Sequence, residues 1–352
     1  MDGLYGGGER YPLELSRALA RGVDCELVTF GRFGRTFTEP GGLRVRVLPT
    51  WARLRGHPVH PVNPALPALL AGADVVHTHH MRSAPSRVAA VASRLTGRPL
   101  AVTDHGLGGG GWCGMLPRLF DRFLVVSRFS GVTLRSPQDR TTVVYGGADP
   151  EAYYPAARSE QREGVLFVGR LTPHKGIDLL IRAVPPGVPL TIVGTGGHDP
   201  RPPESGYPEL LARLACGRQV RFISHADNAE VAALYRRSAV VCLPSVEVTC
   251  YGRRVEISEL LGLTAIEAMA SGTPVVCSRL GGLVEVVQHG ETGFLVQPGD
   301  VAELRDRIGT VLADQRLARQ LGENARVLAL ERFTWEECAQ RCLAAYPPTS
   351  AR

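Results

Sequence analysis

Short apolar segments alternate with helix-like segments along almost the whole chain, and this alternation limits the fold more than any other feature. The apolar segments are rich in β-branched residues and end at glycine, proline or polar residues, as buried parallel strands do. They form two series: Cys25–Phe30, Leu43–Leu48, Asp74–His77, Leu100–Thr103, Phe123–Val126 and Thr142–Val144, then Val165–Val168, Leu190–Val193, Val220–Ile223, Val240–Leu243 and Pro274–Cys277. Each series predicts an α/β unit with a parallel sheet.

Two series of strands predict two domains. The length of 352 residues allows each domain a core of its own. Residues 146–162, between the series, are turn-rich and then polar, as expected of a linker. We expect Rossmann-like domains at residues 1–158 and 159–333 that face each other across a cleft, with ligands at the carboxyl ends of the strands. Residues 334–352 are expected to pack back on the first domain.

The first domain starts unusually. Only Met1–Tyr5 precede the loop Gly6–Glu9, which is too few residues for a buried strand and its turn. We expect the first strand to lie upstream, and a chain extended at its N-terminus to be more soluble and more active. Gly7 and Gly8 lead into the amphipathic pattern of residues 11–19, a helix whose N-terminus is expected to bind the acceptor or a phosphate.

One of the 40 basic side chains is a lysine, Lys175. Where arginine supplies every other positive charge, a lysine suggests a site that needs a compact ammonium group rather than a planar fork. Arg170 and Lys175 lie between the expected strand Val165–Val168 and a helix that begins near Ile177, where helix N-terminal amides favour an anion. This pattern predicts a phosphate site, and survival of one lysine by chance is the alternative.

A second candidate site is the segment ELLGLTAIEAM, which contains Glu259 and Glu267. Glu259 precedes the turn Gly262-Leu263-Thr264, and Glu267 lies in the first turns of the helix that follows. The amides of the turn are expected to point at an anion between the two carboxylates. Acidic residues also favour the first turn of any helix, but that explains either glutamate alone better than it explains both.

The positive charge of the chain is concentrated in its first half. Residues 1–158 carry 19 arginines against 12 acidic residues, whereas residues 159–352 carry 21 basic against 22 acidic residues. No Lys/Arg-rich block, zinc-finger spacing or RNP-like motif accompanies this excess, which favours an anionic acceptor or contact with anionic lipid over binding of nucleic acid. A solvated arginine face is the alternative.

The chain is expected to be cytoplasmic. It contains no run of 18 apolar residues and no signal peptide. Its eight cysteines form no C-x-x-C pair, and several lie in apolar strands, which indicates reduced core thiols. Cys338 and Cys342, one helical turn apart, are expected to pack on one face rather than bind a metal.

Several motifs together resemble the retaining glycosyltransferases of family 4, which have the GT-B fold. They are GRLTPHKG, ELLGLTAIEAMASGTPVV, GGLVEVV, ETGFLV, the opening GGGE and VVYGGADPEAYYP, and the resemblance runs nearly end to end. It implies transfer of a sugar from a nucleotide diphosphate sugar to a small-molecule, glycan or lipid-linked acceptor. The donor would bind mainly to the second domain and the acceptor to the first. No cofactor is implied, and the chain has no D-x-D motif, which agrees with metal independence.

The resemblance also implies roles for residues of the second domain. By their positions in the motifs, Arg170 and Lys175 would hold the diphosphate, with the amides of Gly262, Leu263 and Thr264 near its distal phosphate. Glu267 would bind the ribose hydroxyls, and Glu259 would lie beside the donor sugar.

In the first domain, His105 in AVTDHG matches the family's histidine at the reaction centre. The segment His77–His80 is interpreted as a cleft wall rather than a metal site, since no cysteine completes a ligand set. Gly108–Gly111 is expected to be a mobile acceptor loop, with Trp112 as a stacking platform. Residues 51–57 are interpreted as a surface connection, with docking on a membrane as the alternative.

One segment departs from the family pattern. Between Ser245 and Glu259 lies VEVTCYGRRVEIS, which is longer than expected, so that Tyr251, Arg253 and Arg254 could reach the donor sugar or the acceptor. The identity of the sugar is therefore open. A GT-B-fold nucleotide-sugar epimerase and a degenerate, non-catalytic auxiliary subunit are the alternative functions, although the intact glutamate pair and the lysine argue against decay.

Overall fold

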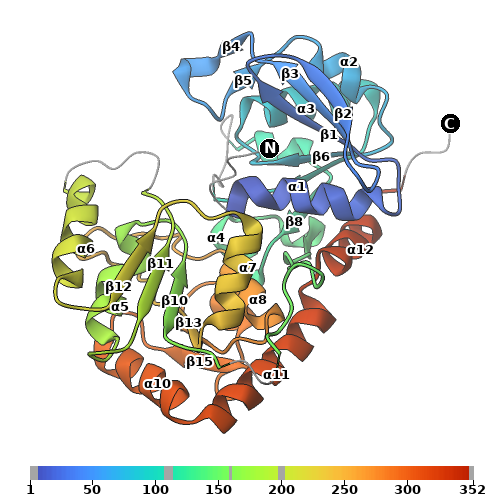
Figure 1. The fold of residues 1–352 in the computed structure, drawn as a ribbon. Helices are drawn as coiled ribbons and strands as arrows, with labels where there is room; N and C mark the ends of the chain where they lie inside the picture. Colours follow the sequence, from blue (N-terminus) through green and yellow to red (C-terminus); the bar gives the residue numbers. More distant parts are fainter. Residues whose placement is uncertain (1–6, 107–113, 158–160, 197–202, 349–352) are drawn as a thin grey trace. The chain divides into compact units, whose positions relative to one another are not determined.

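The computed structural model describes residues 7–106, 114–157, 161–196 and 203–348. The chain forms two compact units, which Figure 1 shows in sequence colours. Among the described residues, the C-terminal unit lies within Gly147–Thr334, and the N-terminal unit combines Gly7–Gly146 with residues 335–348. The units divide at Gly146, ahead of the boundary expected at residue 158. Both contain parallel sheets covered by helices, which confirms the predicted α/β class.

The C-terminal unit contains a six-stranded parallel sheet in the order β12-β11-β10-β13-β14-β15. The strands are β10 Val165–Val168, β11 Leu190–Val193, β12 Val220–Ile223, β13 Val240–Leu243, β14 Val275–Ser278 and β15 Gly293–Val296. Strands β13, β14 and β15 are buried at every residue, as expected of a sheet covered on both faces. Strand β15 is the one that the sequence pattern did not predict.

Helices cover this sheet on both sides (Figure 1). They are α5 Ile177–Ala183, α6 Tyr207–Ala215, α7 Asn228–Arg237, α8 Leu263–Ala270, α9 Leu283–Val286, α10 Val301–Ala313 and α11 Gln315–Arg332, with 3-10 turns η4 Pro173–Lys175 and η5 Glu204–Gly206. Helix α8 packs against α11 and is almost entirely buried, which suits its apolar sequence. Its position is therefore fixed by core packing.

The described residues of the N-terminal unit form three sheets. Strands β1 Glu26–Gly31 and β3 Arg44–Pro49 are parallel, and β2 Arg35–Thr38 joins β3 antiparallel. A four-stranded parallel sheet has the order β6-β7-β8-β9, with β6 Val76–His79, β7 Leu100–Thr103, β8 Arg122–Val125 and β9 Thr141–Val143. Strands β4 Ala52–Arg53 and β5 Pro61–Val62 form a small hairpin around the 3-10 turn η1 Leu54–Gly56. In the described part of the chain, β1 bonds only to β3 and β6 only to β7.

The helices of this unit come from both ends of the chain. They are α1 Gly7–Ala20, α2 Leu66–Leu70, α3 Ala84–Thr96, α4 Arg128–Thr133 and α12 Trp335–Ala345, with 3-10 turns η2 Leu116–Leu119 and η3 Gln138–Arg140. Helix α12 packs against α1. Among the described residues, no helix combines the length and the hydropathy needed to span a bilayer.

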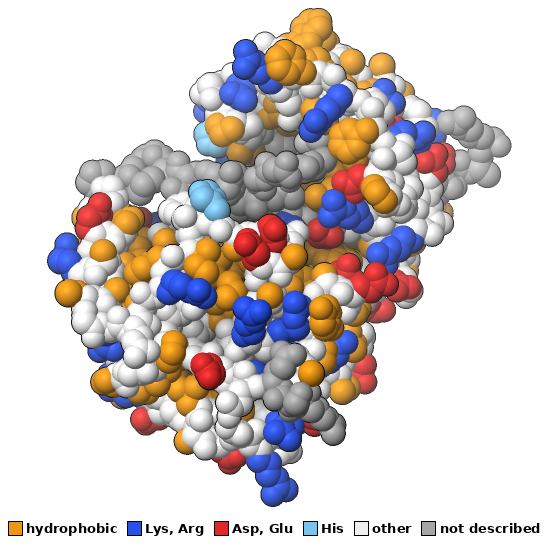
Figure 2. All heavy atoms as spheres, viewed as in Figure 1, with side chains coloured by type: hydrophobic (Ala, Val, Ile, Leu, Met, Phe, Trp, Pro, Cys, Tyr) orange, Lys and Arg blue, Asp and Glu red, His pale blue; other side chains and the backbone are white. Residues whose placement is uncertain are grey.

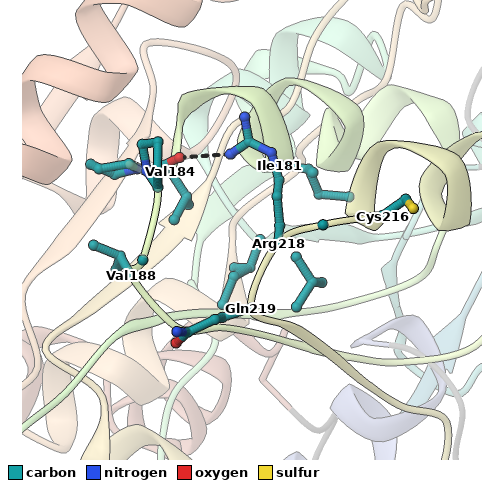
Figure 3. A pocket seen from close by; sticks show the side chains of 12 residues that line it. Ile181, Val184, Val188, Cys216, Arg218 and Gln219 are labelled. Carbon is teal, nitrogen blue, oxygen red and sulfur yellow. Dashed lines mark hydrogen bonds between the residues drawn. The ribbon is translucent and has the colours of Figure 1, made fainter.

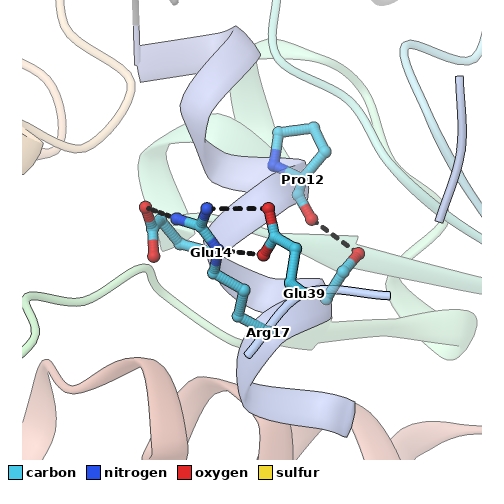
Figure 4. Close-up of polar contacts among 5 residues, drawn as sticks. Pro12, Glu14, Arg17 and Glu39 are labelled. Carbon is cyan, nitrogen blue, oxygen red and sulfur yellow. Dashed lines mark hydrogen bonds and ion pairs between the residues drawn. The ribbon is translucent and has the colours of Figure 1, made fainter. Parts of the chain in front are cut away.

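Helix α1 is held by polar contacts of partly or fully buried side chains (Figure 4). Arg17 donates to both carboxylate oxygens of Glu39, at 2.7 and 3.0 Å, and to Glu14 at 3.0 Å. Hydrogen bonding from Arg17 lowers the pKa of Glu39. Pro12 lacks an N–H group, and its carbonyl accepts a bond of 2.7 Å from the hydroxyl of Ser16. These contacts fix the helix whose first residues, Gly7 and Gly8, were predicted to bind a ligand.

Candidate functional site

The order of the strands in the C-terminal unit defines where a ligand is expected. Strands β11 and β12 lie on one side of β10, and β13 lies on the other, so the strand order reverses between β10 and β13. In open α/β sheets, ligands bind at the carboxyl ends of the strands beside such a reversal. The loops that follow β10 and β13 contain Arg170 and Lys175 on one side and Glu259 on the other.

The two loops approach each other closely because of a glycine. Gly176 has a positive φ of 67°, and a Cβ atom there would lie 2.0 Å from the carbonyl oxygen of Pro244 at the end of β13. No other residue type fits this contact. A backbone bond of 2.8 Å from Val246 to the carbonyl of His174 continues the contact between the loops. This packing brings Lys175 beside the start of the long loop after β13.

Lys175 and Glu259 form an ion pair at this place. The ammonium group of Lys175 donates to Oε1 of Glu259 at 2.6 Å, and the hydroxyl of Ser245 donates to the same oxygen at 2.6 Å. The side chains are 16% and 9% exposed. Burial opposes ionisation of Glu259, but the charge of Lys175 and the two hydrogen bonds outweigh it, so the pKa of the carboxyl group is lowered. The sequence predicted both residues as members of the site, but it predicted neither the bond between them nor the hydrogen bond from Ser245.

The backbone of Glu259 is supported by the segment GGLVEVV. The N–H of Gly282 donates to the carbonyl of Glu259 at 3.0 Å. A Cβ atom at Gly282 would lie 2.3 Å from the carbonyl oxygen of Leu260, so the two loops again meet at a glycine. The position of the Glu259 carboxylate thus depends on backbone contacts on both sides.

The second glutamate, Glu267, lies within helix α8, which follows Glu259 along the chain. Gly262, with φ 97°, precedes α8, and Leu263 and Thr264 form its first turn, where N–H groups have no partner within the helix. Thr264 donates to the carbonyl of Val168 at 3.3 Å. Glu267 is buried and accepts a 3.0 Å hydrogen bond from Tyr235. The first turn of α8 therefore lies where β10 ends, whereas Glu267 is bonded to Tyr235 on α7.

Arg170 is exposed, whereas His174 is buried among charges. Burial lowers the pKa of His174 to about 3, and the positive charges of Lys175, Arg170 and Arg253 act in the same direction, against Glu259. The imidazole is therefore neutral at physiological pH. The sequence reasoning missed His174, although it stands next to Lys175 in the motif.

The long loop after Ser245 folds as a small hairpin. Val248 pairs antiparallel with Arg254, and the N–H of Thr249 donates to the carbonyl of Arg253 at 2.9 Å. The guanidinium of Arg253 donates to both carboxylate oxygens of Glu204, at 2.5 and 2.9 Å. The sequence suggested that Arg253 could reach the donor sugar or the acceptor, but its charge is already matched by Glu204.

Two other residues of this loop differ in environment. The ring of Tyr251 contacts the edge of the Tyr207 ring, with 6.4 Å between centroids. Arg254 is exposed. Tyr207 itself bonds to Asp178 at 2.8 Å, which connects the loop to the start of α5.

In the N-terminal unit, the predicted residues meet at the carboxyl ends of β6 and β7. His105 follows β7, and its Nε2 lies 3.1 Å from Nδ1 of His79 at the end of β6. A Cβ atom at Gly8 would lie 3.6 Å from Cβ of His105, so the first turn of α1, which starts at Gly7, contacts this histidine. The ring of Tyr11 lies 4.8 Å from that of His105. Gly108–Gly111 and Trp112 lie outside the described residues.

One hollow of about 500 Å³ lies at the amino ends of strands in the C-terminal sheet, opposite the carboxyl ends that carry the predicted site. Figure 3 shows Val184, Val188 and Gln219 around it, with Arg218 donating to the carbonyl of Val184 at 3.0 Å. Its walls include the first residues of β11 and β12, at the amino ends of these strands. It contains none of the predicted site residues.

Two family models match the two halves of the chain. The model described as "Glycosyl transferases group 1" matches residues 155–328, and that described as "Glycosyltransferase Family 4" matches residues 5–152. Among curated relatives, the D-inositol 3-phosphate glycosyltransferase of Corynebacterium glutamicum is 34% identical over 227 residues, which are 59% of this chain and 51% of that protein. A glycogen synthase of Mycobacterium tuberculosis is 34% identical over 214 residues, 58% of this chain and 48% of that protein. The chain thus spans about half the length of the curated relatives it matches.

Solved structures resemble the chain over nearly its full length. Sucrose-phosphate synthase from Thermosynechococcus elongatus has a TM-score of 0.71 at 25% identity and covers 96% of this chain and 92% of its own. Anabaena HepE in complex with UDP-glucose has a TM-score of 0.75 at 22% identity, with 98% and 96% covered, which shows a shared fold. Since both halves match models of glycosyltransferases and the fold is shared with solved ones, this chain belongs to the group 1, family 4 glycosyltransferases of the GT-B fold.

Proposed function

We propose that this chain transfers a sugar, with retention of configuration, from a nucleotide diphosphate sugar to an acceptor. The observation that carries the proposal is the pair of Lys175 and Glu259 at the strand-order reversal of the C-terminal unit. The pair supplies a cation suited to a phosphate oxygen and a carboxylate suited to sugar hydroxyls. Retention is inferred from the family.

The chemistry of the proposal concerns the charge of the leaving group. As the bond between sugar and diphosphate breaks, negative charge grows on the diphosphate. We assign the stabilisation of this charge to Lys175, Arg170 and the amides of Leu263 and Thr264, that is, to side chains and backbone rather than to a metal. Glu267, held by Tyr235, is proposed to bind the ribose hydroxyls.

Donor binding requires the ion pair to open. Lys175 would exchange its bond to Glu259 for bonds to phosphate oxygens, while Ser245 keeps its bond to the carboxylate. Glu259 then has acceptor capacity for hydroxyl groups of the donor sugar. In the N-terminal unit, His105 and the first turn of α1 with Gly7 and Gly8 are proposed to contact the acceptor.

A thermal-shift screen with UDP-, GDP-, ADP- and dTDP-sugars tests the proposal, with UDP-glucose first because HepE binds it. A donor at 100 times its dissociation constant should stabilise the chain by about 2.7 kcal/mol. In the variant Lys175→Met the shift should largely disappear. Release of the nucleoside diphosphate then separates sugar transfer from epimerisation, which keeps the donor intact. If no nucleotide sugar stabilises the chain, the proposal is wrong and a non-catalytic subunit is favoured.

We further propose that the basic N-terminal half serves an anionic or lipid-linked acceptor, with a peripheral contact to anionic lipid. A basic apolar patch supports this contact. The N–H of Thr50 donates to the carbonyl of Gly31 at 2.8 Å, so two segments with exposed side chains start side by side. These exposed side chains are Phe33, Trp51, Leu54, Arg32, Arg35, Arg53 and Arg55. Figure 2 shows hydrophobic and basic side chains together over the part of this unit that carries β4 and β5. Exposed tryptophan with arginine suits a lipid interface.

Sedimentation with lipid vesicles tests this contact. The chain should bind phosphatidylglycerol vesicles more strongly than phosphatidylcholine vesicles. The double variant Trp51→Ser, Leu54→Ser should weaken binding by about tenfold or more, since burial of one such side chain is worth about 1.5–3 kcal/mol. Leu95→Ser, at a side chain 82% exposed on α3, is the matched control and should change little. Equal binding to both kinds of vesicle, or none, would contradict the proposal.

A further inference from the structure

The rings of His79 and His105 are hydrogen-bonded edge to edge. Nδ1 of His79 and Nε2 of His105 lie 3.1 Å apart, and the ring planes differ by 14°. The ring centroids are 5.4 Å apart, which exceeds the distance between the nitrogens by about two ring radii. The two nitrogens therefore point at each other in nearly one plane, as in a straight N–H···N hydrogen bond.

Neighbouring groups hold both rings in place. The ring of His77 stacks on that of His79 at 4.7 Å, and its own nitrogens bond to Thr103 and Tyr346 at 2.9 Å each. On the other side, Tyr11 contacts His105, and its hydroxyl donates to the carbonyl of Tyr145 and bonds to Cys338 at 3.1 Å. Neither histidine ring can turn without disturbing this packing.

The bond between the rings holds one proton. Burial lowers the pKa of both histidines well below the usual value, and the neighbouring His77 and His80 act in the same direction, so both rings are neutral. If His105 donates through Nε2–H to Nδ1 of His79, both rings carry their proton on Nε2, the tautomer that free histidine favours. The opposite direction would require the less favoured tautomer in both rings.

We propose that His79 is a positioning residue that fixes His105 as the Nε2–H tautomer. The lone pair on Nδ1 of His105 can then accept a hydrogen bond from a substrate hydroxyl. Nδ1 of His105 has no partner among the described residues. Because its basicity is low, His105 orients the hydroxyl through a hydrogen bond rather than removing its proton. This inference rests on the proposed place of His105 at the acceptor side of the reaction.

Nitrogen NMR of histidine side chains in the full chain tests the tautomer without any substrate. His105 should show an unprotonated Nδ1 and a protonated Nε2, and its signals should not titrate between pH 8 and about 5.5, given the ordinary histidine pKa near 6.5. In His79→Leu, the nitrogen signals of His105 should become an average over its two tautomers. A protonated Nδ1 in the wild type, ordinary titration, or unchanged His105 signals in His79→Leu would overturn the proposal.

A pair of variants separates positioning from packing. Asparagine places an amide oxygen close to the place of Nδ1, whereas leucine of similar shape places a methyl group there. His79→Leu should lower the rate of UDP release from UDP-glucose by about 10- to 100-fold, by analogy with the loss on removing the hydrogen-bond partner of a metal-binding histidine, with the KM for donor little changed. His79→Asn should recover much of that rate and the Nε2–H tautomer.

His105→Ala tests the role of His105 in the reaction separately from the positioning role of His79. If His105→Ala leaves the rate unchanged, the proposed place of His105 in the reaction is wrong, and the NMR result still decides the hydrogen bond. If His105→Ala lowers the rate but His79→Leu and His79→Asn behave alike, the positioning role of His79 is wrong.

Discussion

Lys175→Arg is expected to lower the turnover of the nucleotide sugar by about 10²- to 10³-fold, although it keeps the positive charge. The Lys175 side chain is 16% exposed and its ammonium group lies 2.6 Å from Glu259, in a loop held against Pro244 through Gly176. A guanidinium group is planar and wider, so it cannot occupy the same place or hold a phosphate oxygen in the same direction. Initial rates of nucleoside diphosphate release measure the effect.

The reciprocal variant Arg170→Lys is the control for a change of shape at constant charge. Arg170 is exposed, so its side chain has room to adjust, and the loss should be much smaller than for Lys175→Arg. Wild-type turnover in Lys175→Arg would refute the view that the lone lysine is retained for its shape.

Glu259→Gln is expected to lower the free energy of unfolding by about 3 kcal/mol, because it leaves the Lys175 ammonium without its counter-charge in a largely buried place. Urea unfolding measures this change. Glu204→Gln removes the partner of Arg253, which is 52% exposed, and should cost less than about 1 kcal/mol. The two variants make the same chemical change at a buried and at a surface ion pair.

A double variant and the pH dependence of stability test the same ion pair further. The double variant Lys175→Met, Glu259→Gln should be more stable than Glu259→Gln alone, since no bare charge remains. The folded-state pKa of Glu259 is lowered, so its contribution is complete above the ordinary value of 4.5 and is lost as the pH falls through the folded-state value. A cost in Glu259→Gln no larger than in Glu204→Gln would contradict the importance of the pair.

Most of the strands in the C-terminal unit that the sequence predicts with the right bounds are largely buried. The bounds of β10, β11 and β13 match the prediction because a covered parallel strand needs a continuous apolar run. The half-exposed edge strand β12, VRFI, also matches, because three of its four residues are apolar. Strand β2, with the sequence RTFT, is mostly exposed and carries no such run. Burial therefore accounts for part of the prediction, since β2 is exposed and was missed, whereas β15 was missed although it is buried at every residue.

The candidate site was predicted as separate residues rather than as an arrangement. Lys175 and Glu259 each stood out by type and position, but their bond depends on how Gly176 packs against Pro244, which no local pattern contains. Arg253 is bound by Glu204 for the same reason, since its partner lies 49 residues away along the chain. The roles of these residues in the reaction stay predictions.

The shared oxygen of Glu259 has a consequence for which molecules can occupy the site. Without a ligand, the Lys175 ammonium and the Glu259 carboxylate bond to each other. A ligand must therefore provide a new partner for each group to bind tightly. In the proposed site, a nucleoside diphosphate would bind Lys175 but would leave Glu259 with the Ser245 hydroxyl alone, and a free sugar would bind Glu259 but leave Lys175 without a counter-charge. Only the intact donor would replace both the counter-charge of Lys175 and the lost hydrogen bond of Glu259, so the proposed site would discriminate against the separate nucleotide and sugar. Departure of the spent nucleotide would be favoured by re-formation of the resting pair.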